Sequence, residues 1–511
     1  MKIFRTLTSL AVTVSLLLSP TLTLHAQSQL PVLGDDTAMT LGAERRLGDQ
    51  IGREILADPD LVVDPVLDAY VQSIWQPLVA AAKQRGELSP EMDDAFAWQL
   101  FLLRDKSVNA FALPGGYFGV HLGLLALVDT PDELASVLAH ELTHVTQRHI
   151  ARGMSRQNAQ SPWLLAGAIL AVLAATRSTN ASTDAVSQGA LAASQAAGIQ
   201  SRLNFSRDME READRIGFTL MTPAGYAPAG FIGMFNKLAQ AARFNDNGNF
   251  PYLRSHPLTT ERIADMRART QEQGGAATSS ATSSALQLHR LMAIRARVLS
   301  DLSVDALKTH TAKALLALDA QTAITTLYAG VLAAGQLKDT ALAGQLYNQL
   351  KTWARQTELP PTVAQALRWL AADVQLEGQM EVALDINSST RIEMLYAALS
   401  ASRNGAAGQS AAATARLQLW LTSHPRDAEA WELLARLQLA QNQRIRAAMS
   451  QAEGASARLN DSAALAQYQA AQSLIRQTAP ANIDKVDAAI VDSKVRELQR
   501  RVRELADNAA K

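Results

Sequence analysis

The chain has 511 residues, which is too many for one compact hydrophobic core, so we expect it to divide into two or three domains. Its 48 lysine and arginine residues balance 48 aspartate and glutamate residues, so no net charge attracts the protein to nucleic acid or to an anionic surface. The absence of cysteine excludes disulfides, thiolate metal sites and a cysteine nucleophile.

Residues 1–26 have the pattern of a secretory signal peptide. Lys2 and Arg5 precede a mainly apolar run over residues 7–18, and a short polar segment ends at Ala26. A membrane anchor is the alternative, but this run is shorter than the ~20 apolar residues that a spanning helix needs. We therefore expect the protein to be exported.

The remaining sequence falls into three blocks. Residues 27–272 mix helical patterns with one strand-like stretch, NAFALP, which starts at residue 109. Residues 273–284, QGGAATSSATSS, are predicted to be a linker because they are almost all small. Residues 285–511 have helical patterns almost throughout, so the predicted fold class is mainly α, and we expect residues 27–272 to fold without the helices that follow.

The segment His140-Glu-Leu-Thr-His144 has the spacing of a zinc-protease helix. Residues four apart lie on the same face of a helix, so the two histidines can hold one metal ion between them. Glu141 lies one step round the helix and can reach a water molecule on that metal. Apolar residues on both sides of the pair predict that the helix is buried.

A third ligand has to come from elsewhere. His149 is one residue out of step with the metzincin pattern, in which the last histidine would stand at position 150. In a continuous helix His149 would point about 180° away from His140, so we interpret it as a surface histidine.

Between residues 163 and 200 the sequence contains one more apolar run. Residues 163–175, WLLAGAILAVLAA, are too few to span a membrane and predict a buried or interfacial helix. The stretch that follows, up to about residue 200, is rich in serine, threonine and alanine, and we interpret it as a mobile lid over the cleft.

Residues 206–221, SRDMEREADRIGFTLM, predict a second helix that offers a carboxylate to the metal. Glu210 and Asp214 share one face with two small residues that would let this helix approach the histidine helix closely. We therefore predict that Glu210 is the third ligand and that Asp214 accepts a hydrogen bond from a ligand imidazole. Glu212 is rotated about 200° from Glu210, so we interpret it as a solvated charge.

These two segments resemble the M48 family of zinc metallopeptidases. The resemblance extends through NAFALPGGYFGVHLGLL at residues 109–125 and SHPLTTERI at residues 255–263, and it covers about residues 40–270. It implies an α+β fold of zincin type with a small edge sheet. It also implies one Zn²⁺ per chain on His140, His144 and Glu210, with Glu141 as the general base and Asp214 as a supporting catalytic residue.

Two further roles are implied by the resemblance alone. Asn109 and Ala110 would lie on an edge strand that pairs with an extended substrate, although Asn109 alone also fits an ordinary turn or strand end. His256 would be a regulatory fourth ligand, because in periplasmic members of the family this loop can return to the active site and close the metal's open position. From local sequence alone, His256 is a cap or a packing residue.

The C-terminal block resembles tetratricopeptide repeats, which have a 34-residue period and small residues where their helices cross. The residues that fit this pattern are Pro425, Trp431, Ala435, Ala447 and Gly454, and Leu395 precedes Trp431 by 36 positions with Ala411 and Ala415 at the small positions. An undifferentiated helical bundle is the alternative. Repeats would provide a concave surface for partner proteins.

Together, these features resemble the periplasmic members of the M48 family. The resemblance implies an endopeptidase for misfolded or stalled outer-membrane proteins that contacts the β-barrel assembly machinery through its repeats. A peripheral contact with the membrane is compatible with this location, and no nucleic-acid partner is expected. The alternative is a non-enzymatic periplasmic chaperone or assembly scaffold with a structural metal site. Glu141 favours catalysis, because a purely structural site does not require a residue that is not a ligand.

Overall fold

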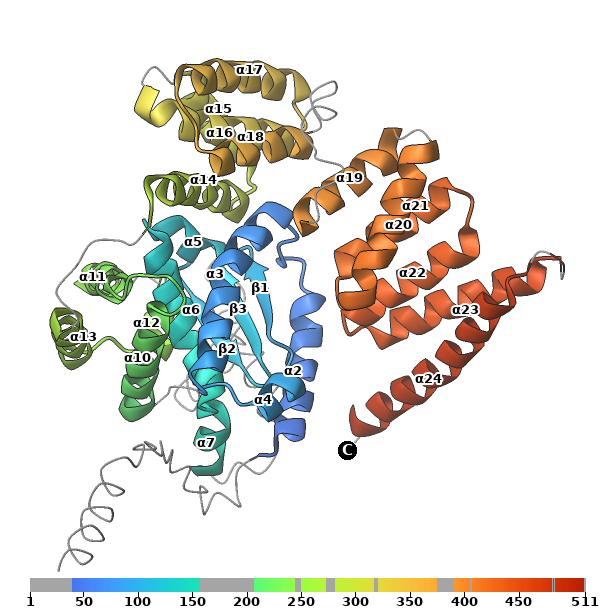
Figure 1. Ribbon diagram of the computed structural model, residues 1–511, viewed down its shortest axis with the longest axis horizontal. Helices are drawn as coiled ribbons and strands as arrows, with labels where there is room; N and C mark the ends of the chain where they lie inside the picture. Colours follow the sequence, from blue (N-terminus) through green and yellow to red (C-terminus); the bar gives the residue numbers. More distant parts are fainter. Residues whose placement is uncertain are drawn as a thin grey trace, which may run out of the picture. The chain divides into compact units, whose positions relative to one another are not determined.

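The computed structural model describes most of the chain from residue 39 onward (Figure 1). The described ranges are 39–156, 206–243, 250–272, 281–316, 320–374, 390–404, 407–479, 481 and 483–509. The predicted signal peptide, the apolar run at residues 163–175 and the stretch interpreted as a lid lie outside them. The described residues confirm a mainly α fold with one small sheet. None of the described helices has the length and apolar character that a membrane span requires.

The part of the chain that resembles M48 peptidases, about residues 40–270, is called the peptidase-like part below. It begins with three helices, α2 (Leu41–Leu56), α3 (Pro65–Gln84) and α4 (Pro90–Ala95). Each begins at a polar N-cap whose side chain accepts a hydrogen bond from a backbone N–H in the first turn, and α3 and α4 also have proline at their first position. These caps set where each helix starts.

The sheet has three strands in the order β1-β3-β2, namely β1 (Gln99–Leu103), β2 (Ala110–Leu113) and β3 (Tyr117–His121). The central strand β3 runs parallel to β1 and antiparallel to β2. Gly115 and Gly116 adopt positive φ angles of 72° and 79° in the turn between β2 and β3, a conformation that glycine tolerates best. Because the strand order is β1-β3-β2, β2 is an outer strand of the sheet.

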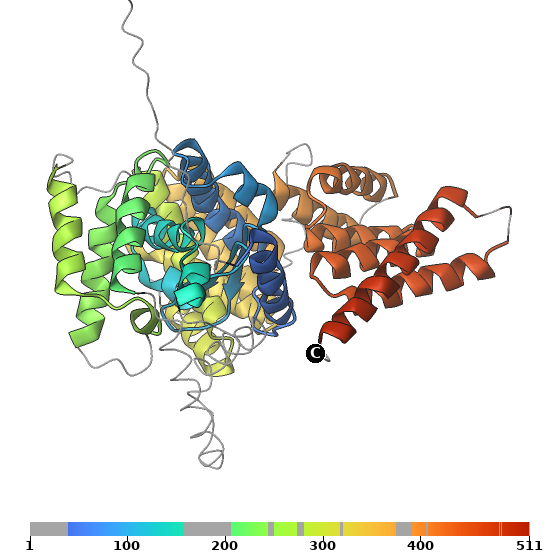
Figure 2. The ribbon, with the colours of Figure 1, turned by 90° about the horizontal axis from the view of Figure 1, so that it is seen from below.

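The helices that follow the sheet include one fully buried helix, α6. They are α5 (Leu122–Leu127), α6 (Pro131–Thr146), α7 (His149–Arg156), α10 (Arg207–Met221), α11 (Ala229–Arg243), α12 (Tyr252–Ser255) and α13 (Thr260–Glu272). Every residue of α6 is buried. The helix contacts both α3 and α10 (Figures 1 and 2). A helix that is covered on all sides holds its side chains in fixed positions.

The close approach of α10 to α6 depends on Gly217. A Cβ atom at this position would lie 3.1 Å from the carbonyl carbon and oxygen of Ala139 and 3.2 Å from the backbone nitrogen of His140. These distances are shorter than ordinary van der Waals contacts, so a larger residue would push the two helices apart. Glycine thus lets the carboxylates of α10 reach the histidines of α6.

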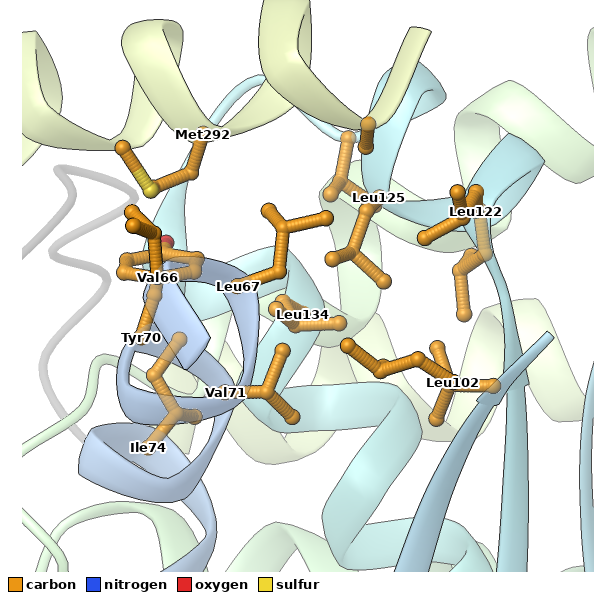
Figure 3. Close-up of a cluster of buried hydrophobic side chains, with 14 of the residues drawn as sticks. Val66, Leu67, Tyr70, Val71, Ile74, Leu102, Leu122, Leu125, Leu134 and Met292 are labelled. Atoms are coloured by element: carbon orange, nitrogen blue, oxygen red, sulfur yellow. The ribbon is translucent and has the colours of Figure 1, made fainter. Parts of the chain in front are cut away.

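The core of this part continues across the predicted linker into α14 (Ser283–Ser300). Met292 lies beside Val66 and Tyr70 of α3, in the same hydrophobic cluster as Leu134 of α6 (Figure 3). The buried Arg295 bonds Asp64, the N-cap of α3, through Nε at 2.9 Å and Nη2 at 2.7 Å. The division at residues 273–284 remains a prediction. Because α14 contributes to the same hydrophobic core as α3 and α6, we no longer expect residues 27–272 to fold without it.

All regular secondary structure in the rest of the described chain is helical. Its helices are α15 (Val304–Leu315), α16 (Ala320–Gln336), α17 (Thr340–Gln356), α18 (Pro361–Asp373), α19 (Arg391–Asn404), α20 (Ala407–Ser423), α21 (Ala428–Ala440), α22 (Arg444–Ala457), α23 (Asp461–Gln477) and α24 (Lys485–Ala509). From α19 onward, consecutive helices pack on one another. A Cβ atom on Gly454 would lie 3.3 Å from Cβ of Trp431, so this glycine marks a tight crossing of α21 and α22. That contact fits the predicted repeat.

Candidate metal centre

Four side chains from three segments converge in the peptidase-like part. His140 and His144 project from α6, Glu210 comes from α10, and His256 directly follows α12. All four are buried, and one ligand atom from each lies within 4.8 Å of the others. The structure thus brings the three residues predicted as ligands to one point, together with the histidine predicted as a fourth.

The donor atoms lie 3.0–3.5 Å apart, which is close to the spacing of ligands around a tetrahedral metal ion. Ligand atoms at the usual zinc distances of about 2.0–2.2 Å from a tetrahedral ion lie about 3.3–3.6 Å from one another. Nε2 of His140 is 3.0 Å from Nε2 of His144 and 3.5 Å from Glu210 Oε2. Nδ1 of His256 is 3.0 Å from Glu210 Oε1 and 3.3 Å from His140 Nε2. Imidazole nitrogens and a carboxylate oxygen are the donors that zinc takes, so the cluster fits Zn²⁺.

Glu141 lies beside the cluster but is not part of it. Its side chain is buried, and Oε1 is 3.4 Å from Nε2 of His256. Neither carboxylate oxygen has a partner with hydrogen-bond geometry among the described residues, although the hydroxyl of Tyr252 is a neighbour. Burial raises the pKa of this carboxyl group, against the positive charges of His256 and His140 and the hydroxyl of Tyr252, which lower it. Buried carboxylates are rarely left without a partner, so this position is suited to a water molecule or a substrate group.

The histidines of α6 differ in their affinity for protons when no metal is bound. Burial opposes the charged form of His140, but hydrogen bonds to Asp214 and Glu210 outweigh it and raise its pKa to about 9. Burial and the charge of His140 lower the pKa of His144 well below its usual value. A metal takes neutral imidazole, so metal binding here competes with a proton on His140.

Asp214 and Arg262 form a rigid support behind the ligands. Asp214 Oδ1 lies 3.0 Å from Nδ1 of His140. Arg262 of α13 donates to the same carboxylate from Nε at 2.6 Å and from Nη2 at 2.8 Å. Its Nη1 lies 2.8 Å from Glu210 Oε2 and donates to the carbonyl oxygen of Pro257 at 2.8 Å. Arg262 therefore links a ligand, the partner of a second ligand and the loop that carries His256.

The role of Arg262 was not predicted from the sequence, although the residue lies in a segment that the sequence analysis singled out. The residue stands six places after His256 in SHPLTTERI. Its buried side chain would have been difficult to infer, because most arginines are exposed unless they are paired. Two adjacent carboxylates provide that pairing here.

The interpretation of His149 as a surface histidine is wrong, whereas Glu212 is partly exposed and is paired with His149. The side chain of His149 is fully buried, with Nδ1 2.9 Å from Nδ1 of His144. Its Nε2 is 3.1 Å from Glu212 Oε2. The interpretation assumed a continuous helix, but α6 ends at Thr146 and Arg148 has a positive φ of 52°. The chain turns there and brings His149 back toward His144.

Asn109 and Ala110 lie where an outer strand begins. Ala110 is the first residue of β2 and pairs with Val120 of β3. The backbone carbonyl of Asn109 accepts a hydrogen bond from the N–H of His121 at 3.0 Å, whereas its side-chain oxygen is buried with no hydrogen-bond partner among the described residues. The preceding carbonyl, on Val108, accepts from the N–H of Tyr252 in α12 at 3.3 Å. The segment that leads into β2 is thus tied to the turn that positions His256.

Known proteins are similar to the part of the chain that contains this site. Residues 65–270 match the model of peptidase family M48. A putative β-barrel assembly-enhancing protease of Vibrio cholerae is 34% identical over 277 residues, which cover 53% of this chain and 54% of that protein. The β-barrel assembly-enhancing protease of Escherichia coli is 34% identical over 245 residues, which cover 48% and 47%. The mitochondrial metalloendopeptidase OMA1 of Saccharomyces cerevisiae is 29% identical over 205 residues, which cover 39% and 55%. The chain matches about half the length of these relatives.

Proposed function

We propose that this protein is a zinc-dependent endopeptidase, because residues 65–270 match the model of peptidase family M48. One observation supports the proposal most strongly. A buried carboxylate that is not a ligand, Glu141, lies beside four converging metal ligands and has no partner with hydrogen-bond geometry among the described residues. A scaffold with a structural metal does not need such a group.

His140, His144 and Glu210 would hold the ion. A bound Zn²⁺ would supply Lewis-acid chemistry, which polarises a carbonyl group and makes water more acidic. Glu141 accepts the proton of the water that attacks the scissile carbonyl and then delivers it to the leaving amine nitrogen. Burial raises the pKa of this carboxyl group, which makes it a stronger base once ionised.

Asp214 orients His140 and is itself held by Arg262. In the observed geometry the Nδ1–H group of His140 donates to Asp214, so the lone pair of Nε2 is directed at the cluster. The two hydrogen bonds from Arg262 fix the carboxylate in the plane that this contact requires.

Substrate would bind in an extended conformation along β2. This is an outer strand of the sheet, and Asn109 at its entrance has a buried side-chain oxygen without a hydrogen-bond partner among the described residues. A substrate N–H group would satisfy that acceptor. Backbone pairing of this kind tolerates many sequences, which suits a protease that acts on misfolded proteins.

With His256 as a fourth ligand the site would be latent, because the four-ligand set would leave no open position on the metal. Structural zinc sites are closed, whereas catalytic ones keep an open position. The ring of Tyr252 stacks on His256 with their centroids 4.6 Å apart, and the backbone bond from Tyr252 to Val108 holds the turn in place. A partner or a substrate that displaces this turn would open the site. Because Val108 leads directly into β2, substrate that pairs there would act on the same backbone.

The relatives suggest where the enzyme works. Relatives named a putative β-barrel assembly-enhancing protease and a β-barrel assembly-enhancing protease, together with the predicted signal peptide, support the proposal that this protein acts in the periplasm, in the assembly and quality control of outer-membrane proteins. Its substrates would be misfolded or stalled outer-membrane proteins. The helices from α19 to α24 would contact the assembly machinery, because helical repeats commonly bind partner proteins.

Chelation tests the proposed activity. Purified protein should cleave casein, lose this activity when a chelator removes the metal, and recover it when one equivalent of Zn²⁺ per chain is added. To separate latency from inactivity, the His256→Ala variant is assayed in parallel. If neither protein cleaves casein with zinc bound, the protein is a scaffold with a structural metal.

A further inference from the structure

His149 is a buried imidazole that the proposed mechanism does not use. It is the first residue of α7 and its side chain is fully buried, yet both of its ring nitrogens have polar neighbours. Nδ1 lies 2.9 Å from Nδ1 of His144, and Nε2 lies 3.1 Å from Glu212 Oε2. His149 therefore connects a predicted metal ligand to a carboxylate on α10.

Only one arrangement of protons satisfies all three groups when His144 binds a metal. Nε2 of His144 lies in the cluster, 3.5 Å from Glu210 Oε1, so its lone pair has to be available to the metal. The proton of the neutral imidazole is then on Nδ1, which donates to His149. His149 must accept at Nδ1, so its own proton is on Nε2 and is donated to Glu212.

The break between α6 and α7 makes this contact possible. The N–H of Gln147 bonds the carbonyl of Thr143, and Arg148 then takes a left-handed conformation with φ of 52°. The Nε of Arg148 donates to the buried carboxylate of Glu44 at 3.0 Å, which anchors the turn against α2. A non-glycine residue held in this conformation indicates that the surrounding structure stabilises it.

Glu212 is also held from a second side. Nη1 of Arg152, one turn along α7 from His149, donates to the same Oε2 atom at 3.0 Å. The carboxylate is partly exposed, with 28% of its side-chain surface accessible, so it can remain charged. The three acidic residues of EREAD on α10 thus all contribute to the site. Glu210 lies in the cluster, Asp214 contacts His140, and Glu212 reaches His144 through His149.

We propose that Glu212 and His149 are positioning residues for His144, which hold its imidazole in the tautomer and orientation that bind zinc through Nε2. The proposal rests on the proposed function, because it takes His144 to be a zinc ligand. It assigns a role to the histidine five residues after the second histidine of HELTH and to the contact between that histidine and Glu212.

Zinc affinity tests the proposal independently of catalysis. The dissociation constant is measured by competition with a chromophoric chelator for wild type, His149→Phe and His149→Gln. Phenylalanine retains a flat ring but cannot accept a hydrogen bond, so we expect zinc to bind roughly tenfold to a hundredfold more weakly, as is usual when the partner of a ligand histidine is lost. Glutamine offers a carbonyl oxygen to His144 and should recover most of the affinity.

A second pair of variants gives the same information from the other end of the contact. Glu212→Leu removes the acceptor for His149 and should weaken zinc binding, whereas Glu212→Gln keeps an acceptor oxygen and should weaken it less. Asp208→Asn is the matched control, because Asp208 is an exposed carboxylate on the same helix and should have wild-type affinity. Absorption spectra of the Co²⁺-substituted proteins should change in His149→Phe and not in Asp208→Asn.

The possible outcomes separate this inference from the proposed function. Failure of wild type to bind zinc would refute the proposed function and this inference with it. If wild type binds zinc and His149→Phe binds it within twofold of wild type, only the positioning role is refuted. Equal losses in the phenylalanine and glutamine variants would also refute it, because they would indicate a packing role. Should His149→Phe not fold, as judged by circular dichroism without metal, the two Glu212 variants decide.

Discussion

Replacement of Arg295 by alanine should strongly destabilise the peptidase part, although the residue lies beyond the predicted linker. Its guanidinium group is buried and contacts Asp64 through Nε and Nη2, Asp373 through Nη2 at 2.6 Å, and the hydroxyl of Tyr328 through Nη1 at 3.0 Å. Removal of the arginine leaves two carboxylates without their charged partner. The loss of one partner from a buried ion pair costs about 3–5 kcal/mol, out of a total that is usually about 5–15 kcal/mol.

The assay for Arg295 is urea unfolding of the full chain, which is monitored by circular dichroism and by zinc content in the same samples. Arg290→Ala is the matched control, because Arg290 is exposed on the same helix and should change the free energy of unfolding by less than about 0.5 kcal/mol. Arg295→Met restores much of the buried volume but not the charge, so it should remain destabilised. If Arg295→Ala unfolds within about 1 kcal/mol of wild type, the reasoning that α14 belongs to the peptidase core is refuted.

Four further predictions concern the site and the domain boundary. Single alanine substitutions of the three main ligands should each sharply reduce zinc content, measured by atomic emission; these are His140, His144 and Glu210. Asp214→Ala should weaken zinc binding or activity by roughly tenfold to a hundredfold, and an unchanged dissociation constant and rate would refute its role as support. His256→Ala should keep its zinc, bound more weakly, and cleave casein and itself faster than wild type, whereas slower cleavage would return His256 to a structural role. A chain that ends at residue 284 lacks Met292 and Arg295 and should give no cooperative unfolding transition, while one that ends at residue 374 should; a stable 284-residue chain would refute the shared core.

The main features of the site follow from local periodicity in the sequence. The spacing of four between His140 and His144, and between Glu210 and Asp214, places each pair on one helix face, and the structure brings both faces together. Gly217 could also be anticipated, since a small residue at that position permits a close approach of helices. Such inferences succeed because they need only the geometry of a regular helix.

The residues that were missed depend on where a helix stops or on contacts between distant segments. The direction of the His149 side chain was predicted wrongly because α6 ends at Thr146 and the chain turns at Gln147 and Arg148. No glycine or proline marks this helix end in the sequence. Arg262 and Arg295 bind carboxylates that lie 48 and 231 residues away. A small-residue linker predicts a flexible connection, but it does not predict which core the next helix joins.

The most direct test of the proposed mechanism compares the His256→Ala protein with the double variant Glu141→Gln, His256→Ala at equal zinc occupancy. Both proteins carry the His256→Ala substitution so that latency does not limit the rate, and zinc content is measured on the samples that are assayed for casein cleavage. The mechanism predicts that Glu141→Gln holds one zinc per chain and has lost nearly all cleavage, because glutamine cannot accept the proton of the attacking water. Equal cleavage by the two zinc-loaded proteins would contradict it.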